Sequence, residues 1–207
     1  MKPCIVLIGT QHVGKTTLGR GLAERLGVPF YDTDQMVTKT FNKHICVFAQ
    51  EGGQESYNWA ETEMSKILVE KYKNSKTISA VISTGSGFWA DDTGIEELRK
   101  IGTLYWINGD INLGAQRLME EATKDPAKAN PYLLKNGDYY NVYFSTPVIK
   151  SLEDIKTRHI QRATAATEYF AKIADVKVTP KDSSAEENIQ LLYDSLIGDE
   201  LRQRTAS

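Results

Sequence analysis

The chain has 207 residues, of which 41% are hydrophobic, and its 25 basic residues nearly balance its 27 acidic residues. A chain of this length and hydrophobic content can bury one substantial core, so we expect a single domain over residues 1–207. The formal net charge of -2 gives no electrostatic reason to expect a nucleic acid or a membrane surface as a partner. Small-molecule chemistry is therefore the favoured class of function.

Short apolar runs alternate with longer helical patterns along the chain, which is typical of a sheet covered by helices. We predict strands at 4–9, 28–34, 79–85, 103–107 and 176–178, and helices at 15–26, 54–73 and 184–197. In the first of these helices, Leu18, Leu22 and Leu26 share one face, and Gly27 ends it. The pattern predicts an α/β fold, a three-layer sandwich around a five-stranded parallel sheet.

Residues 121–150 depart from this regularity. They contain three of the six prolines and four of the ten tyrosines, with no sustained period. We expect a long, partly irregular insertion here. A connection of this length inside a compact domain is usually functional, often as a cover that closes over a site, and a passive surface loop is the alternative.

Cysteine usage and the amino terminus bear on the compartment. Cys4 and Cys46 fit no metal-ligand spacing, and Cys4 opens the first apolar run as a small hydrophobic residue. The run continues directly into a glycine-rich loop, which is not the layout of a signal peptide, and no window approaches the ~18 apolar residues of a membrane span. We therefore expect a cytoplasmic protein without a membrane segment.

The sequence GTQHVGKT at residues 9–16 matches the phosphate-binding pattern GxxxxGK[ST] between a predicted strand and a predicted helix. Gly9 and Gly14 permit the close backbone approach that lets main-chain N–H groups and a helix N-terminus hold phosphates. Lys15 supplies a positive charge to the β- and γ-phosphates, and the Thr16 hydroxyl is a ligand for Mg²⁺. This loop predicts a nucleoside triphosphate site.

Two carboxylates follow where the second predicted strand ends. Asp32 and Asp34 are two residues apart, so strand alternation would point both to the carboxyl edge of the sheet, where α/β folds bind ligands. We expect Asp32 to hold magnesium through water and Asp34 to accept a hydrogen bond from an attacking hydroxyl. The alternative is that Asp32, Thr33 or Asp34 caps a helix starting near Gln35, and the two roles can coexist.

The stretch GTQHVGKTTLGRGLAERLGVPFYDTD, residues 9–34, resembles the opening of the shikimate kinase family. The resemblance continues in ICVFAQEGG (45–53), VISTGSG (81–87), INLGAQRL (111–118) and YFAKIADVKV (169–178), and it covers the chain apart from the insertion. It implies the family fold, ATP and Mg²⁺ as cofactors, and a monomer.

The resemblance also carries binding roles onto matching positions. It implies that Thr17 belongs to the nucleotide site and that Arg117 stacks on adenine, opposite a wall supplied by 179–182. It places Gly85, Ser86 and Gly87 at the triple-glycine strand end beside the acceptor, with serine in place of the middle glycine.

Three positions depart from the family pattern, because arginines that grip the acid substrate or the transferring phosphate are absent. The residues at these positions are Asn58, Asn130 and Ala166, whereas Glu61, the usual partner of the first arginine, is retained. Arg162 lies one turn before Ala166 on the same helical face and is our candidate to replace a missing arginine. Asn58 is expected to contact the substrate as a neutral residue. Lys124 and Lys128 are candidates for the second position. The alternative for Arg158 and Arg162 is that they are solvated helix charges.

We predict a kinase in which Lys15 stabilises charge on the transferring group and Asp34 orients or deprotonates the acceptor hydroxyl. Shikimate, giving shikimate 3-phosphate, is the leading small-molecule acceptor by resemblance. The alternatives are a kinase for another hydroxylated metabolite, such as a sugar acid, and a nucleotide-binding pseudo-kinase without activity.

Overall fold

The structure is a computed structural model, and it describes residues 2–87, 92–124, 132–135, 138–141 and 151–205. Its central sheet has five parallel strands in the order β2-β3-β1-β4-β7. The strands are β1 (Cys4–Ile8), β2 (Phe30–Asp32), β3 (Ala80–Ser83), β4 (Gly102–Ile107) and β7 (Val176–Val178). The predicted five-stranded parallel α/β sandwich is confirmed.

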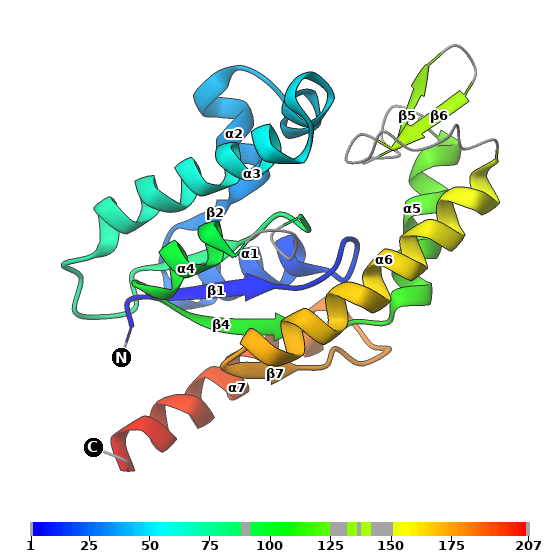
Figure 1. Cartoon of the computed structure of the whole chain (residues 1–207). Coiled ribbons are helices and arrows are strands. Elements are labelled where there is room, and N and C mark those ends of the chain that lie inside the picture. Colours follow the sequence, from blue (N-terminus) through cyan, green and yellow to red (C-terminus); the bar gives the residue numbers. More distant parts are fainter. Residues whose placement is uncertain (1, 88–91, 125–131, 136–137, 142–150, 206–207) are drawn as a thin grey trace.

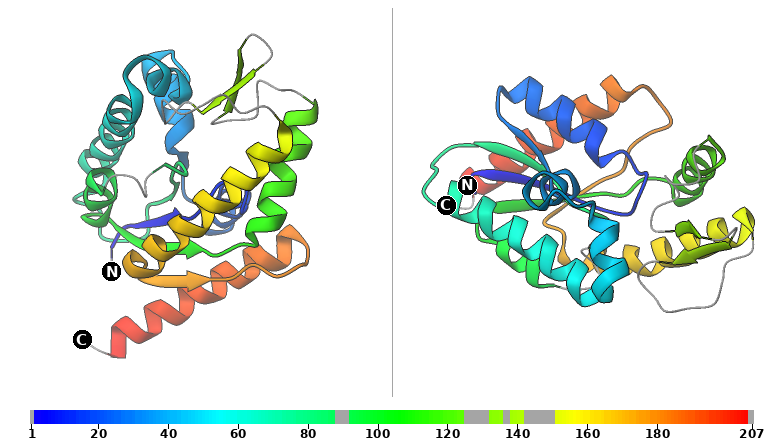
Figure 2. Two further views of the ribbon diagram at one scale, coloured as in Figure 1. Left: turned by 45° about the vertical axis from the view of Figure 1, so that its right-hand side comes forward. Right: turned by 90° about the horizontal axis from the view of Figure 1, so that it is seen from above.

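Helices cover both faces of this sheet (Figure 1; Figure 2). One face packs against α1 (Lys15–Leu26) and α7 (Ala185–Thr205), and the other packs against α3 (Ile45–Tyr72), α4 (Thr93–Arg99) and α6 (Leu152–Ile173). Two further helices, α2 (Thr33–Phe41) and α5 (Ile111–Lys124), follow β2 and β4 at the carboxyl ends of these strands. No helix in the described part of the chain has the length and apolarity needed to cross a membrane.

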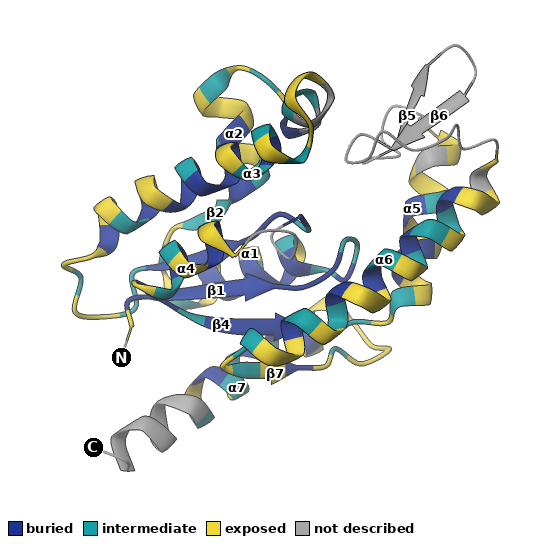
Figure 3. Ribbon diagram, in the orientation of Figure 1, coloured by how far each residue is buried: buried dark blue, intermediate teal, exposed yellow. Residues whose placement is uncertain are grey.

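Strand alternation divides the core into two layers. In β1, Cys4, Val6 and Ile8 face the α3–α4–α6 layer, whereas Ile5 and Leu7 face the α1–α7 layer. All five side chains are buried, and Figure 3 shows β1 and β4 as part of the buried centre of the molecule. Each fully buried side chain of this size stabilises the fold by about 1.5–3 kcal/mol, so β1 is held rigidly where it enters the glycine-rich loop.

The bounds of several elements differ from the prediction. Strand β2 ends at Asp32, and Asp34 lies in the first turn of α2, so the two carboxylates do not alternate along one strand. Helix α3 begins before the predicted residue 54 and is interrupted at Gly53, where φ is 65° and ψ is -158°. The short α4 was not predicted.

Part of the predicted insertion is regular. Helix α5 continues to Lys124, and β5 (Tyr132–Lys135) pairs antiparallel with β6 (Asp138–Asn141), with Tyr132 opposite Asn141. Figure 1 shows this two-stranded sheet beyond the ends of α5 and α6. Asn130 and Lys128, two positions singled out in the sequence, lie outside the described residues, and the covering role of 121–150 stays a prediction.

Candidate active site

The loop of residues 9–16 joins β1 to α1 at the carboxyl edge of the sheet. Gly9 has a φ of 145° and Gly14 a φ of 97°, which L side chains rarely adopt. A β-carbon at Gly9 would also lie 2.7 Å from the carbonyl oxygen of Ile107. Both glycines of the motif are therefore required by the backbone itself, and Gly14 precedes the first residue of α1.

Lys15 folds back over this loop. Its Nζ donates hydrogen bonds to the carbonyl oxygens of Gly9 at 2.9 Å and Thr10 at 2.7 Å, and the residue is only 8% exposed. Burial lowers the pKa of Lys15 to about 8, and the negative charges of Asp34, Asp32 and Glu61 act in the opposite direction. The cation is thus held among the loop's own oxygens and beside the carboxylates.

Thr16 and Asp32, the two residues predicted to hold magnesium, lie in direct contact. The Thr16 hydroxyl donates to Oδ2 of Asp32 at 2.9 Å, while Oδ1 of Asp32 accepts from the main-chain N–H of Gln35 at 3.3 Å and caps α2. The described residues form no cluster of three or more His, Cys, Asp or Glu side chains suited to a metal. One hydroxyl and one carboxylate suit Mg²⁺, which keeps waters and is held partly by substrate phosphates.

Asp34 stands apart from this pair. Its Oδ1 is buried and has no hydrogen-bond partner among the described residues. Burial, reinforced by the charge of Asp32 and opposed by Lys15, raises the pKa of Asp34 to about 7. A β-carbon at Gly85 would lie 2.5 Å from this Oδ1 and 2.3 Å from Oε1 of Glu61, so the glycine allows both carboxylates to approach the strand end.

Tyr57 is a further residue that lines the site. Its buried hydroxyl donates to Oε1 of Glu61 at 3.0 Å, and its ring would lie 2.4 Å from a β-carbon at Gly87. Asn58 does not share the contact with Glu61, because its Oδ1 accepts a hydrogen bond from Nε2 of Gln54 at 2.6 Å. The only signal for this arrangement was the four-residue spacing of Tyr57 and Glu61, which places them on one helical face.

One cavity of about 1400 Å³ connects these groups. It is bordered by the phosphate loop, by the carboxylates of α2 and β2, by the strand end at Ser86 and by the segment that precedes α7. Among the predicted site residues, those that line it are Gly14, Lys15, Thr16, Thr17, Asp32, Asp34, Ser86 and Arg117. Gly9, Gly85 and Gly87 contribute backbone geometry behind this lining, whereas Asn58 and Arg162 are not among the lining residues.

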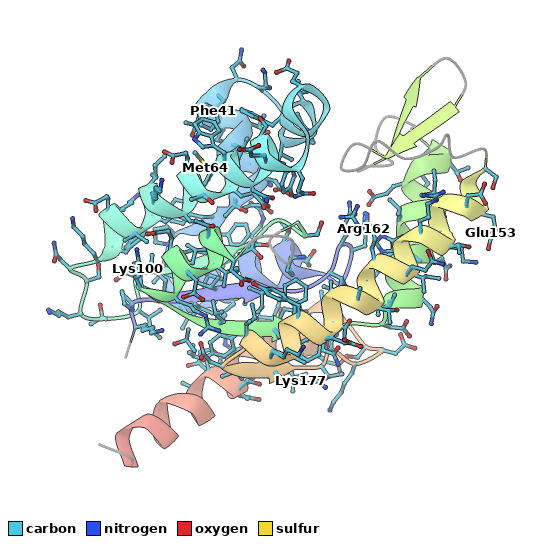
Figure 4. The ribbon with its side chains drawn as sticks, viewed as in Figure 1. Phe41, Met64, Lys100, Glu153, Arg162 and Lys177 are labelled. Atoms are coloured by element: carbon cyan, nitrogen blue, oxygen red, sulfur yellow. The ribbon has the colours of Figure 1, made fainter. Side chains whose placement is uncertain are left out.

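Arg117 and Arg162 reach the site region from different helices. Arg117, on α5, donates from Nη1 to the carbonyl oxygen of His12 at 3.0 Å, which places it against the phosphate loop. Arg162 projects from the middle of α6 toward the interior of the molecule, as Figure 4 shows, and its charge helps to lower the pKa of His159. The His159 ring lies 6.2 Å from that of His12, so Arg162 belongs to the neighbourhood of the loop.

Comparison with known proteins identifies the class. The shikimate kinase family model matches residues 12–196. A curated shikimate kinase from Caldicellulosiruptor saccharolyticus is 34% identical over 134 residues, which cover 65% of this chain and 70% of that protein. A shikimate kinase from Acinetobacter baumannii, solved in complex with shikimate, aligns with a TM-score of 0.74 at 20% identity over 97% of this chain and 96% of that one. A gluconokinase from Sinorhizobium meliloti aligns with a TM-score of 0.56 at 13% identity over 100% and 98%.

These matches define a P-loop phosphotransferase with an alcohol group as acceptor. The chain belongs to the shikimate kinase family. The family resemblance stated from the sequence is confirmed, while the roles of individual site residues stay predictions.

Proposed function

We propose that this chain transfers the γ-phosphoryl group of ATP to a hydroxyl of shikimate, giving shikimate 3-phosphate. One observation supports this most directly: the Asp34 carboxylate, whose buried Oδ1 has no described hydrogen-bond partner, borders the same cavity as Lys15 and Thr16. A carboxylate in this state accepts a hydrogen bond from an incoming alcohol. The phosphate loop beside it supplies the group to be transferred.

In this proposal the transfer follows from the positions of four groups. Main-chain N–H groups of residues 9–16 bind the phosphates, and Lys15 stabilises negative charge on the transferring group. Asp34 accepts the proton of the acceptor hydroxyl while the oxygen of that hydroxyl bonds to the γ-phosphorus. The bond from that phosphorus to the bridging oxygen breaks, and ADP leaves. Mg²⁺, held by Thr16 and Asp32, would neutralise phosphate charge when bound.

The acceptor is assigned from the family, because the curated relatives carry the name shikimate kinase. We propose that Arg162 binds the acceptor's carboxylate, since Asn58 is neutral and its Oδ1 is bonded to Gln54. The same observation supports a second candidate, a kinase for another hydroxylated metabolite such as a sugar acid. A cytoplasmic, monomeric enzyme acting on a small molecule, without nucleic-acid or membrane partners, completes the proposal.

ADP release with single acceptors tests the proposal. Purified protein with ATP and Mg²⁺ is assayed with shikimate, gluconate, a panel of polyols, and no acceptor. Shikimate-dependent turnover well above the no-acceptor rate is the expected result. Turnover with gluconate or a polyol alone would support the second candidate, and no acceptor-dependent turnover together with tight nucleotide binding would support a pseudo-kinase.

A further inference from the structure

The segment between β7 and α7 forms one end of the cavity. Pro180, Lys181, Asp182 and Ser183 line it together with Arg117. The phosphate loop fixes the phosphates, and Asp34 marks the side on which the γ-phosphate meets the acceptor. The nucleoside of ATP is attached at the other end of the phosphate chain, and under the proposed function it would extend toward Arg117 and the segment 180–183.

A single side chain holds this segment by its main chain. Asn188, in the first turn of α7, is 8% exposed. Its Oδ1 accepts a hydrogen bond from the N–H of Lys181 at 2.8 Å, and its Nδ2 donates to the carbonyl oxygen of the same residue at 3.1 Å. Nδ2 also donates to the carbonyl oxygen of Ser184 at 3.2 Å and lies 3.4 Å from Oγ of Ser183. One amide thus fixes both main-chain groups of Lys181.

This use of Asn188 leaves its amide without a free donor. A carboxamide has two N–H hydrogens, and the contacts to Lys181, Ser183 and Ser184 occupy both of them. The start of α7 has its own support, because Ser184 and Glu187 exchange reciprocal hydrogen bonds in a capping box. Asn188 is therefore not needed to begin the helix, and its side chain acts on the segment before it.

We propose that Asn188 is a positioning residue for the nucleoside end of ATP. It holds the main chain of Lys181 in the conformation that borders the nucleoside. The inference rests on the proposed use of a nucleotide at this site. Without the side chain, the segment populates other conformations. The apparent Kd of a nucleoside-bearing ligand then equals its intrinsic Kd divided by the fraction of protein molecules in the binding-competent conformation. A ligand that consists of phosphates alone does not depend on this segment.

Two variants and two ligands test the proposal. Asn188→Ala removes all of these hydrogen bonds, and the isosteric Asn188→Asp places a carboxylate oxygen against the carbonyl oxygens of Lys181 and Ser184. Calorimetry measures the Kd of ADP and of inorganic tripolyphosphate, and steady-state kinetics gives KM for ATP and for the acceptor. We expect the Kd of ADP and the KM for ATP to rise about tenfold, which corresponds to a competent fraction near a tenth. Tripolyphosphate affinity, acceptor KM and kcat at saturating ATP stay near wild type.

Gln190→Ala is the matched control, because this amide on the same helix donates to Asp194 at 2.7 Å and does not line the cavity. Unchanged ADP affinity in both Asn188 variants, or equal losses for ADP and tripolyphosphate in folded protein, would overturn the proposal. If Asn188→Ala lacks a cooperative melting transition, Asn188→Asp decides alone. The binding comparison needs no acceptor, so it separates this proposal from a failure of phosphoryl transfer; wild-type protein that binds no ADP would overturn both.

Discussion

Gly85 and Asp34 are so close that any side chain at residue 85 would collide with the Asp34 carboxylate. A β-carbon there would lie 2.5 Å from Oδ1, and the main-chain N–H of Gly85 donates to the Thr33 hydroxyl at 2.9 Å. The segment that follows β3 is thereby fixed to the first turn of α2. The position of the proposed catalytic carboxylate is set jointly by these two segments.

Gly85→Ala should lower kcat for acceptor phosphorylation by about a hundredfold, because the methyl group must displace the carboxylates of Asp34 and Glu61 from a precise geometry. Binding of ADP, measured by calorimetry, should change little. Gly198→Ala is the control, since a β-carbon at that position meets nothing within 4 Å. Full activity in Gly85→Ala would show that the close approach has no catalytic importance.

Asp34→Asn should reduce phosphoryl transfer by about 10²–10⁴-fold, the usual contribution of a general base, while ADP affinity stays within a few-fold of wild type. The amide keeps the shape of the side chain but accepts no proton. Single-turnover measurement of shikimate phosphate, alongside ADP titration, separates the two effects. Equal losses of binding and transfer would assign Asp34 a structural role instead.

Arg162→Ala should raise the acceptor KM by about tenfold or more if the guanidinium binds the acceptor's carboxylate, because charged hydrogen bonds contribute about 1.5–3 kcal/mol. The KM for ATP should not change. Lys172→Ala removes an exposed positive charge from the same helix and serves as the control. Wild-type kinetics in Arg162→Ala would show that Arg162 does not take the role of the missing family arginine.

His159 should make stability depend on pH. Burial, with the nearby His12 and Arg162 adding to it, lowers the pKa of His159 to about 4, below the value of about 6.5 in the unfolded chain. Between these values the unfolded state binds a proton that the folded state does not. The free energy of unfolding should therefore fall as the pH drops from about 6.5 to about 4, by up to about 3 kcal/mol from this residue.

Urea denaturation across this pH range measures the effect. His159→Gln should flatten the pH dependence in that window relative to wild type, even if the variant is less stable overall. An identical slope in wild type and variant would mean that His159 contributes nothing to the dependence. His44, which is exposed, provides the control substitution His44→Gln.

The sequence was sufficient for the sheet and the phosphate loop because both depend on local patterns. The apolar run of β1 followed by two obligatory glycines and a helix specifies this structure within a few residues. The assignment of Asp34 to a strand was wrong, because four residues cannot distinguish a strand period from a helical one. Asp32 and Asp34 nevertheless line the same cavity. Asp32 caps α2, so the helix begins at Thr33 and Asp34 lies in its first turn instead of continuing the strand.

Other parts of the site depend on contacts between distant segments. Asn188 reads from sequence as one more residue of the closing helix, and only the path of the preceding segment brings Lys181 within reach of its amide. The Tyr57–Glu61 pair was visible by spacing, but the approach of Tyr57 to Gly87 depends on how α3 packs against the end of β3. The sequence placed Arg162 one turn before Ala166 on the same helical face, and only the packing of α6 brings it near the phosphate loop. Its binding of the acceptor's carboxylate stays a prediction.

The bonds of Lys15 to the carbonyl oxygens of Gly9 and Thr10 have a kinetic consequence. An arriving triphosphate competes with these two oxygens for the same ammonium group, so nucleotide capture involves an exchange of partners and not the folding of an unstructured loop. Little conformational entropy is lost in that exchange. Association should accordingly be fast, and differences in affinity among nucleotides should appear mainly in how quickly they leave.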